Sequence, residues 1–305
     1  MKSVKIYKMQ LLQQVDQVLL TSLDLLKRWL MVLKPLVYPR LMQQLLQSKP
    51  LLAQLNCSMN QERVQQRFAD RGETFRHSRL QALAMLASVS FSAGLTEECL
   101  ATSRQVGREA RAALASHPGD PFLRGKVIEA AIGESRAATV LGCPHDADAS
   151  IGEAVRLAEE FVANEPAVFF HVQRLVSTLR EQGAHCAAVG RPDDALAACE
   201  RLRGALAPWR DAEARREFVA AWLAISYAEA AGVHRGRGDH AGAADCFEKG
   251  VEVAMAPKRG KLLLGLAECS AACGDFERAR RAAAEAMADP GSVDAAREIL
   301  AHIDR

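Results

Sequence analysis

The feature of this sequence that most constrains its fold is a glycine that recurs every 48 residues, at Gly94, Gly142, Gly190 and Gly238, and once more 36 residues later, at Gly274. Each glycine ends a stretch rich in alanine and leucine, and most of them begin another. Glycine readily ends a helix in the left-handed conformation, whereas Ala and Leu are strong helix formers. The spacing therefore predicts an all-α chain of successive helical hairpins, with a glycine at the turn between helix A and helix B of each.

Small residues stand at two fixed distances from these glycines. Seven residues before the glycine come Ala87, Ser135, Gly183, Ala231 and Ala267. Five residues after it come Cys99, Ala147, Ala195, Ala243 and Ala279. Small side chains let two helices approach closely, so both sets are expected where helix A crosses helix B.

Start and stop signals agree with these hairpins. Asp239 and Asp275 follow their glycines as candidate N-caps. A proline follows each helix B, at Pro118, Pro166, Pro208, Pro257 and Pro290, and disfavours helix at the residue before it. In the second hairpin Ser150 and Glu153 form a capping-box pattern. Helix B is expected there to begin one to two turns late, with Ala154 at the crossing.

The pattern resembles the tetratricopeptide repeat (TPR). It is clearest in Leu179…Gly183…Gly190-Arg-Pro-Asp-Asp-Ala195…Cys199…Pro208 and in Leu263…Ala267…Gly274-Asp-Phe-Glu-Arg-Ala279. The spacing of 48 exceeds the usual 34 residues and is similar to a long-unit bacterial variant. The resemblance covers about residues 79–290. It implies a right-handed α-solenoid of about five TPR-like hairpins and a non-enzymatic scaffold that binds a protein or peptide in a concave groove. The eight cysteines fall at helical or helix-end positions and indicate reduced thiols, so a cytoplasmic protein is expected.

In such repeats helix A lines the concave face. The outward positions that the resemblance assigns to partner binding are Glu129, Arg136, Arg180, Arg235, Lys261 and Glu268. The three arginines come from consecutive hairpins and could form a basic strip for an acidic peptide, because guanidinium groups pair well with carboxylates. The alternative is ordinary solvated charge on a helix surface.

Residues 1–60 differ from the repeat domain expected over residues 61–305. They are rich in Leu and Gln, contain no glycine, and carry eight Lys and Arg residues against two Asp residues. Heptad-spaced leucines, at Leu12, Leu19, Leu26 and Leu33, predict an N-terminal Leu-rich helical segment with one apolar face. Three interpretations stay open: a cap on the first hairpin, a self-association helix giving a homo-oligomer, and an interfacial membrane helix. The second would suit a regulatory or sensor module.

The sequence contains no pattern that indicates catalysis, a metal site or a cofactor. Cys269 and Cys273 are four residues apart, but zinc needs about four ligands, and Cys143, His145 and Asp146 lie in a loop with nothing to complete a site. No apolar run approaches the ~20 residues of a membrane span. The basic charge is concentrated in residues 1–60 and the rest of the chain is net negative, so no nucleic acid is expected as a partner.

Overall fold

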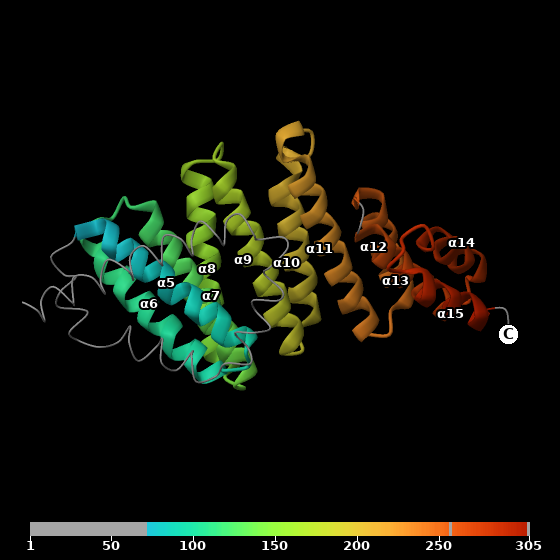
Figure 1. Cartoon of the computed structure of the whole chain (residues 1–305), viewed down its shortest axis with the longest axis horizontal. Helices are drawn as coiled ribbons and strands as arrows, with labels where there is room; N and C mark the ends of the chain where they lie inside the picture. Colours follow the sequence, from blue (N-terminus) through green and yellow to red (C-terminus); the bar gives the residue numbers. More distant parts are fainter. Residues whose placement is uncertain (1–71, 256–257, 304–305) are drawn as a thin grey trace, which may run out of the picture. The chain divides into compact units, whose positions relative to one another are not determined.

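The computed structural model describes residues 72–255 and 258–303, with side chains from Arg76 onward. Within these ranges the chain contains eleven α-helices and no strand. Ten of them pair in chain order: α5 (Gly72–Ser92) with α6 (Thr96–Ser116), α7 (Pro121–Val140) with α8 (Pro144–Asn164), α9 (Phe169–Ala188) with α10 (Pro192–Leu206), α11 (Arg216–Gly236) with α12 (His240–Val253), and α13 (Lys258–Ala272) with α14 (Phe276–Ala286). The last helix is α15 (Val293–Ile303). Figure 1 shows this succession, and the predicted all-α solenoid of five hairpins is confirmed.

The five periodic glycines are the turns of the five hairpins. They are the only residues with positive φ in the described part of the chain, at +72° to +80°. The residue that follows each glycine donates its N–H to the carbonyl oxygen of the residue four positions before the glycine. The five bonds run from Leu95 to Ser90, Cys143 to Ala138, Arg191 to Cys186, Asp239 to His234, and Asp275 to Ser270, over 2.8–3.0 Å. This is the Schellman pattern of a helix C-terminus. A Cβ added at any of the five glycines would meet nothing within 4 Å, so the backbone conformation, and not lack of space, requires glycine.

The small residues on either side of the turns are buried, as predicted. The residue that stands five positions after each glycine is at most 1% exposed. A Cβ added at Gly183 would lie 3.5 Å from the carbonyl oxygen of Ala195. The two helices of a hairpin therefore touch through backbone and methyl groups, which fixes their separation.

The caps confirm one part of the sequence prediction and correct another. The carboxylates of Asp239 and Asp275 accept bonds from the N–H groups of Gly242 and Arg278. The late start predicted for helix B of the second hairpin is wrong: α8 begins at Pro144, directly after the turn. Proline fits the first position of a helix, where its missing N–H has no partner to lose. Ala147 is therefore fully buried in register with the other hairpins.

The first helices of successive hairpins, called the A helices (α5, α7, α9, α11 and α13), form one side of the stack. Besides packing on its own partner, α7 contacts α9, α9 contacts α11, and α11 contacts α13. The half-buried and exposed stripe that runs along these A helices is called the A face below. No helix in the described ranges is both long and apolar enough to cross a membrane.

Candidate binding surface

All six residues predicted to bind a partner lie on the A face. Glu129 and Arg136 are on α7, Arg180 is on α9, Arg235 is on α11, and Lys261 and Glu268 are on α13. Five of these side chains are between 35% exposed, for Glu129 and Arg136, and 54% exposed, for Glu268, and Lys261 is exposed. The positions are thus accessible to a partner.

The three arginines of the expected basic strip are each bonded to a glutamate on the next A helix. The Nε atom of Arg136 donates to Glu181 over 2.6 Å, with a second bond between the same two groups. Arg180 donates to Glu229 over 2.6 Å. Arg235 donates to Glu268 over 3.1 Å.

A fourth pair runs in the opposite sense. Arg174 of α9 donates to Glu129 of α7 over 3.2 Å, and Glu129 is also paired with Lys126. The eight residues Glu129, Arg174, Arg136, Glu181, Arg180, Glu229, Arg235 and Glu268 are called the charge ladder below. They connect α7, α9, α11 and α13 through alternating charges.

Burial changes the electrostatics of this ladder. Burial is the main reason that the pKa of Glu229 is raised above its ordinary value, although Arg180 acts to lower it. The hydrogen bond that Arg136 donates to Glu181 is the main reason that the pKa of the Arg136 guanidinium is raised. The A face therefore presents matched charges of both signs instead of an unpaired basic strip.

Glu181, Glu229 and Arg174 were not singled out from the sequence. They stand 45, 49 and 45 residues from Arg136, Arg180 and Glu129, close to one repeat period. A search for opposite charges separated by one period would have identified these pairs.

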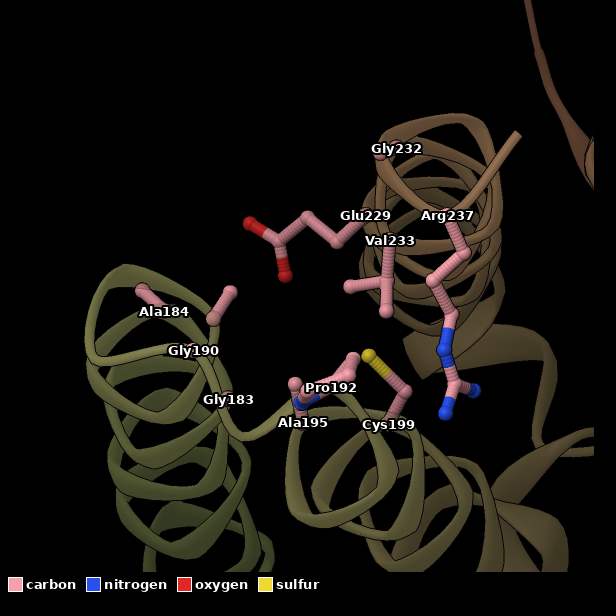
Figure 2. A pocket seen from close by; sticks show the side chains of 12 residues that line it. Gly183, Ala184, Gly190, Pro192, Ala195, Cys199, Glu229, Gly232, Val233 and Arg237 are labelled. Atoms are coloured by element: carbon pink, nitrogen blue, oxygen red, sulfur yellow. The ribbon is translucent and has the colours of Figure 1, made fainter. Parts of the chain in front are cut away.

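A cavity of about 480 Å³ opens between the third hairpin and α11 (Figure 2). Its walls are unusually small side chains: Gly183, Ala184 and Ala187 on α9, and Gly232 and Gly236 on α11. Cys199 of α10 and Val233 of α11 point into it, while Glu229 reaches over it from α11. Burial raises the pKa of the Cys199 thiol to about 11, so this side chain is a neutral part of the lining.

A smaller hollow of about 300 Å³ lies between α5, α6 and α7. Met85, Phe91 and Cys99 line it together with Arg136, whose guanidinium carbon lies 6.0 Å from the centre of the Phe91 ring. The space that is open here is smaller than the cavity at the junction of α9 and α11.

The cysteine and histidine residues weighed from the sequence as metal ligands or nucleophiles do not form such a site in the part of the chain that the structure describes. His145 is fully exposed and Cys143 is exposed, while Cys269 is buried and Cys273 is exposed. No group of three or more metal-ligating side chains occurs within the described ranges. Burial raises the pKa of the Cys186 thiol, which leaves it protonated and a poor nucleophile.

His185, next to Cys186, bonds the second hairpin to the third. Its Nδ1 atom lies 2.7 Å from the hydroxyl of Thr139 on α7, and its Nε2 atom lies 2.9 Å from Asp148 on α8. Asp148 is also paired with Arg191. Thr139, Asp148, His185 and Arg191 are called the polar bridge below.

The sequence matches no protein-family model, and a search of the curated proteins gives no match. Similar solved structures include BtubC (BKLC) from P. vanneervenii, at 13% identity and a TM-score of 0.55, with 83% of this chain and 91% of that chain covered. Another is a kinesin-light-chain-type protein from Podosopora anserina with nearly identical TPR-like repeats, at 18% identity and a TM-score of 0.50, with 75% and 98% covered. The chain therefore has a TPR-like fold, a solenoid of helical hairpins.

Proposed function

We propose that this chain is a non-enzymatic scaffold or adaptor that binds a protein or a peptide on its A face. The single observation that supports the proposal best is that four consecutive A helices present one continuous surface of accessible charged side chains. All six residues chosen from the sequence lie on it. Helical-repeat folds commonly use such extended surfaces for recognition.

The charge ladder bears on the chemistry of the partner. The predicted acidic peptide would have to displace Glu181, Glu229 and Glu268 from the arginines that they bond. Replacing one carboxylate by another gains little free energy, because the new pair mostly repeats the interaction that was lost. We therefore propose a partner segment that carries charges of both signs, as the ladder does.

Charge reversal on α13 tests the proposed surface without cutting the ladder between α7, α9 and α11. In affinity capture from cells that produce the chain, Lys261→Glu with Glu268→Lys should lose partners that the wild type retains. The matched control is Lys249→Glu with Glu252→Lys, which reverses two exposed charges on α12. If the α13 variant retains every partner, or if the α12 variant loses the same ones, the A face is not the binding surface.

Self-association through Leu12, Leu19, Leu26 and Leu33 is a second proposal, and these residues lie outside the described ranges. Its support is their heptad spacing. In light scattering of the full chain, Leu19→Lys with Leu26→Lys should convert an oligomer to a monomer. A wild-type chain that is already monomeric would end this proposal, and with it the regulatory role that depends on it.

A further inference from the structure

The cavity between α9, α10 and α11 is left open by this chain's own side chains. A Cβ added at Gly232 or at Gly236 would meet nothing within 4 Å. Elsewhere on the A helices, buried glycines are covered by a neighbour: Arg174 lies 2.7 Å from a Cβ added at Gly125, and Phe247 lies 2.5 Å from one added at Gly265. Gly232 and Gly236 are instead exposed at the cavity, so packing within this chain explains the two buried glycines but not Gly232.

Gly232 lowers the stability of its helix, and no contact within the described part of the chain compensates for this. It lies within α11, four residues before Gly236. Glycine inside a helix costs about 1 kcal/mol relative to alanine. Glycines four residues apart expose the backbone of one helix face, so that an incoming group can approach it closely.

The cavity is large enough for a ligand and mostly apolar. Its volume of about 480 Å³ falls in the range of small-molecule and side-chain pockets, roughly 300–1,000 Å³. Ala187, Ala195, Cys199 and Val233 offer methyl, methylene and thiol groups to its interior. An aliphatic side chain would be favoured there by the removal of apolar surface from water.

The charge at the cavity selects the group that accompanies the aliphatic side chain. Glu229 extends over the cavity (Figure 2), and only its Oε1 atom accepts a bond, from Arg180, within the described part of the chain. Its side chain is 31% exposed, and burial raises its pKa. A partly desolvated carboxylate with an available oxygen favours a cation.

The other charged group at the cavity, Arg237, is already paired with a carboxylate. Arg237 donates to Asp193 over 2.8 Å, and Asp193 is 83% exposed. An acidic ligand at Arg237 would have to compete with this carboxylate. Charge complementarity therefore favours a basic ligand at Glu229.

We propose that this cavity binds a segment of a partner protein in which an aliphatic side chain stands next to a lysine or arginine. The aliphatic group fills the space beside Gly232 and Val233, and the basic group donates to Glu229. This inference rests on the proposed function and adds the chemistry of the partner.

Selection from a library of random seven-residue peptides on the immobilised full chain tests the inference. The expected result is enrichment of an aliphatic residue beside Lys or Arg. Enrichment of acidic residues in place of basic ones beside the aliphatic residue, or no enrichment, would overturn it. The best enriched peptide is then titrated against the variants below.

Gly232→Leu should weaken that peptide about tenfold or more, because the leucine occupies the cavity. The chain should stay folded, since the new Cβ meets nothing within 4 Å and leucine is the better helix former. The matched control is Gly204→Leu on α10, where an added Cβ also meets nothing within 4 Å, and it should leave the affinity unchanged. A peptide that binds Gly232→Leu as tightly as the wild type would show that the cavity is not its site.

Glu229→Gln separates the two parts of the recognition. It should reduce affinity for the basic peptide about threefold to tenfold, and it should remove the preference over the same peptide with Glu in place of the basic residue. An unchanged preference would overturn the role of Glu229. If Gly232→Leu has no effect while the α13 charge reversal still loses partners, the cavity inference fails and the proposed A-face function stands.

Discussion

The junction between the second and third hairpins is bridged by polar side chains, with a hollow of about 200 Å³ beside them, whereas the junction between the third and fourth holds the open cavity of about 480 Å³. Both are built from hairpins with the same glycine turn and with small residues at the same crossing positions. They differ at the position five residues before the turn glycine, which is His185 in α9 and Val233 in α11. His185 reaches Thr139 and Asp148, whereas Val233 borders a cavity.

The partners at equivalent positions differ in the same way. Ala187 and Leu196 of the third hairpin stand where Thr139 and Asp148 stand in the second. A polar side chain at position 233 would find no matching groups there. Repeat geometry therefore sets the spacing of hairpins, while a few side chains decide whether a junction is bridged or open to a partner.

The largest effect is expected at the turns that both junctions share. Gly142→Val and Gly190→Val should each lower the free energy of unfolding by about 2 kcal/mol or more, because a β-branched residue is strained at positive φ. Denaturant titration followed by circular dichroism measures this. Gly204→Val, in a helix, is the control and should change stability by less than about 0.5 kcal/mol. Turn variants as stable as this control would show that left-handed φ is not what the glycines supply.

The next effect is expected at the polar bridge. His185→Val places the side chain of the open junction into the bridged one and should cost about 1–3 kcal/mol, since Thr139 and Asp148 lose a buried partner. In the reciprocal variant, Val233→His, the new imidazole should find no hydrogen-bond partner, so the free energy of unfolding should not rise. The same denaturant titration compares the two. An equal effect at both sites would mean that the junctions are not distinguished by these side chains.

The bridge also predicts a dependence of stability on pH. Burial acts to raise the pKa of Asp148, but hydrogen bonds from His185 and Arg191 outweigh it and hold the pKa below its ordinary value. The carboxylate therefore stabilises the fold above the unfolded pKa of about 3.9, and this contribution is lost as pH falls through the folded pKa. The stability difference between the wild type and Asp148→Asn should be constant near pH 5 and shrink toward pH 2. A difference that stays constant to pH 2 would contradict the pairing.

The smallest effect is expected in the charge ladder. A double-mutant cycle on Arg136 and Glu181 should give a coupling energy of about 0.5–1 kcal/mol that falls with added salt. The more exposed pair, Arg235 with Glu268, should give less, because water screens it more strongly. The reverse order would show that burial does not set the strength of these pairs.

The turns and crossings could be predicted from the sequence because each depends on residues close in the chain. Glycine for positive φ, aspartate for the N-cap and small residues at the crossing all act within one hairpin. The late start of α8 was predicted wrongly because Ser150 and Glu153 offered a cap, whereas Pro144 begins the helix directly after the turn.

The charge pairs and the cavity depend on how one hairpin faces the next. Arg136 and Glu181 are 45 residues apart, and their meeting requires the register between repeats, which no local signal specifies. For the same reason no pattern in the sequence singles out Gly232. Only its surroundings reveal that nothing in the described part of the chain covers it.

The most direct test of the central claim, that the open junction is where this chain receives a partner, is an NMR titration of the labelled full chain with the selected basic-aliphatic peptide. The amide signals of Gly232, Val233 and Gly236 should shift most, and those around His185 should hardly move. Shifts centred on His185 and Asp148, with Gly232 unchanged, would contradict it.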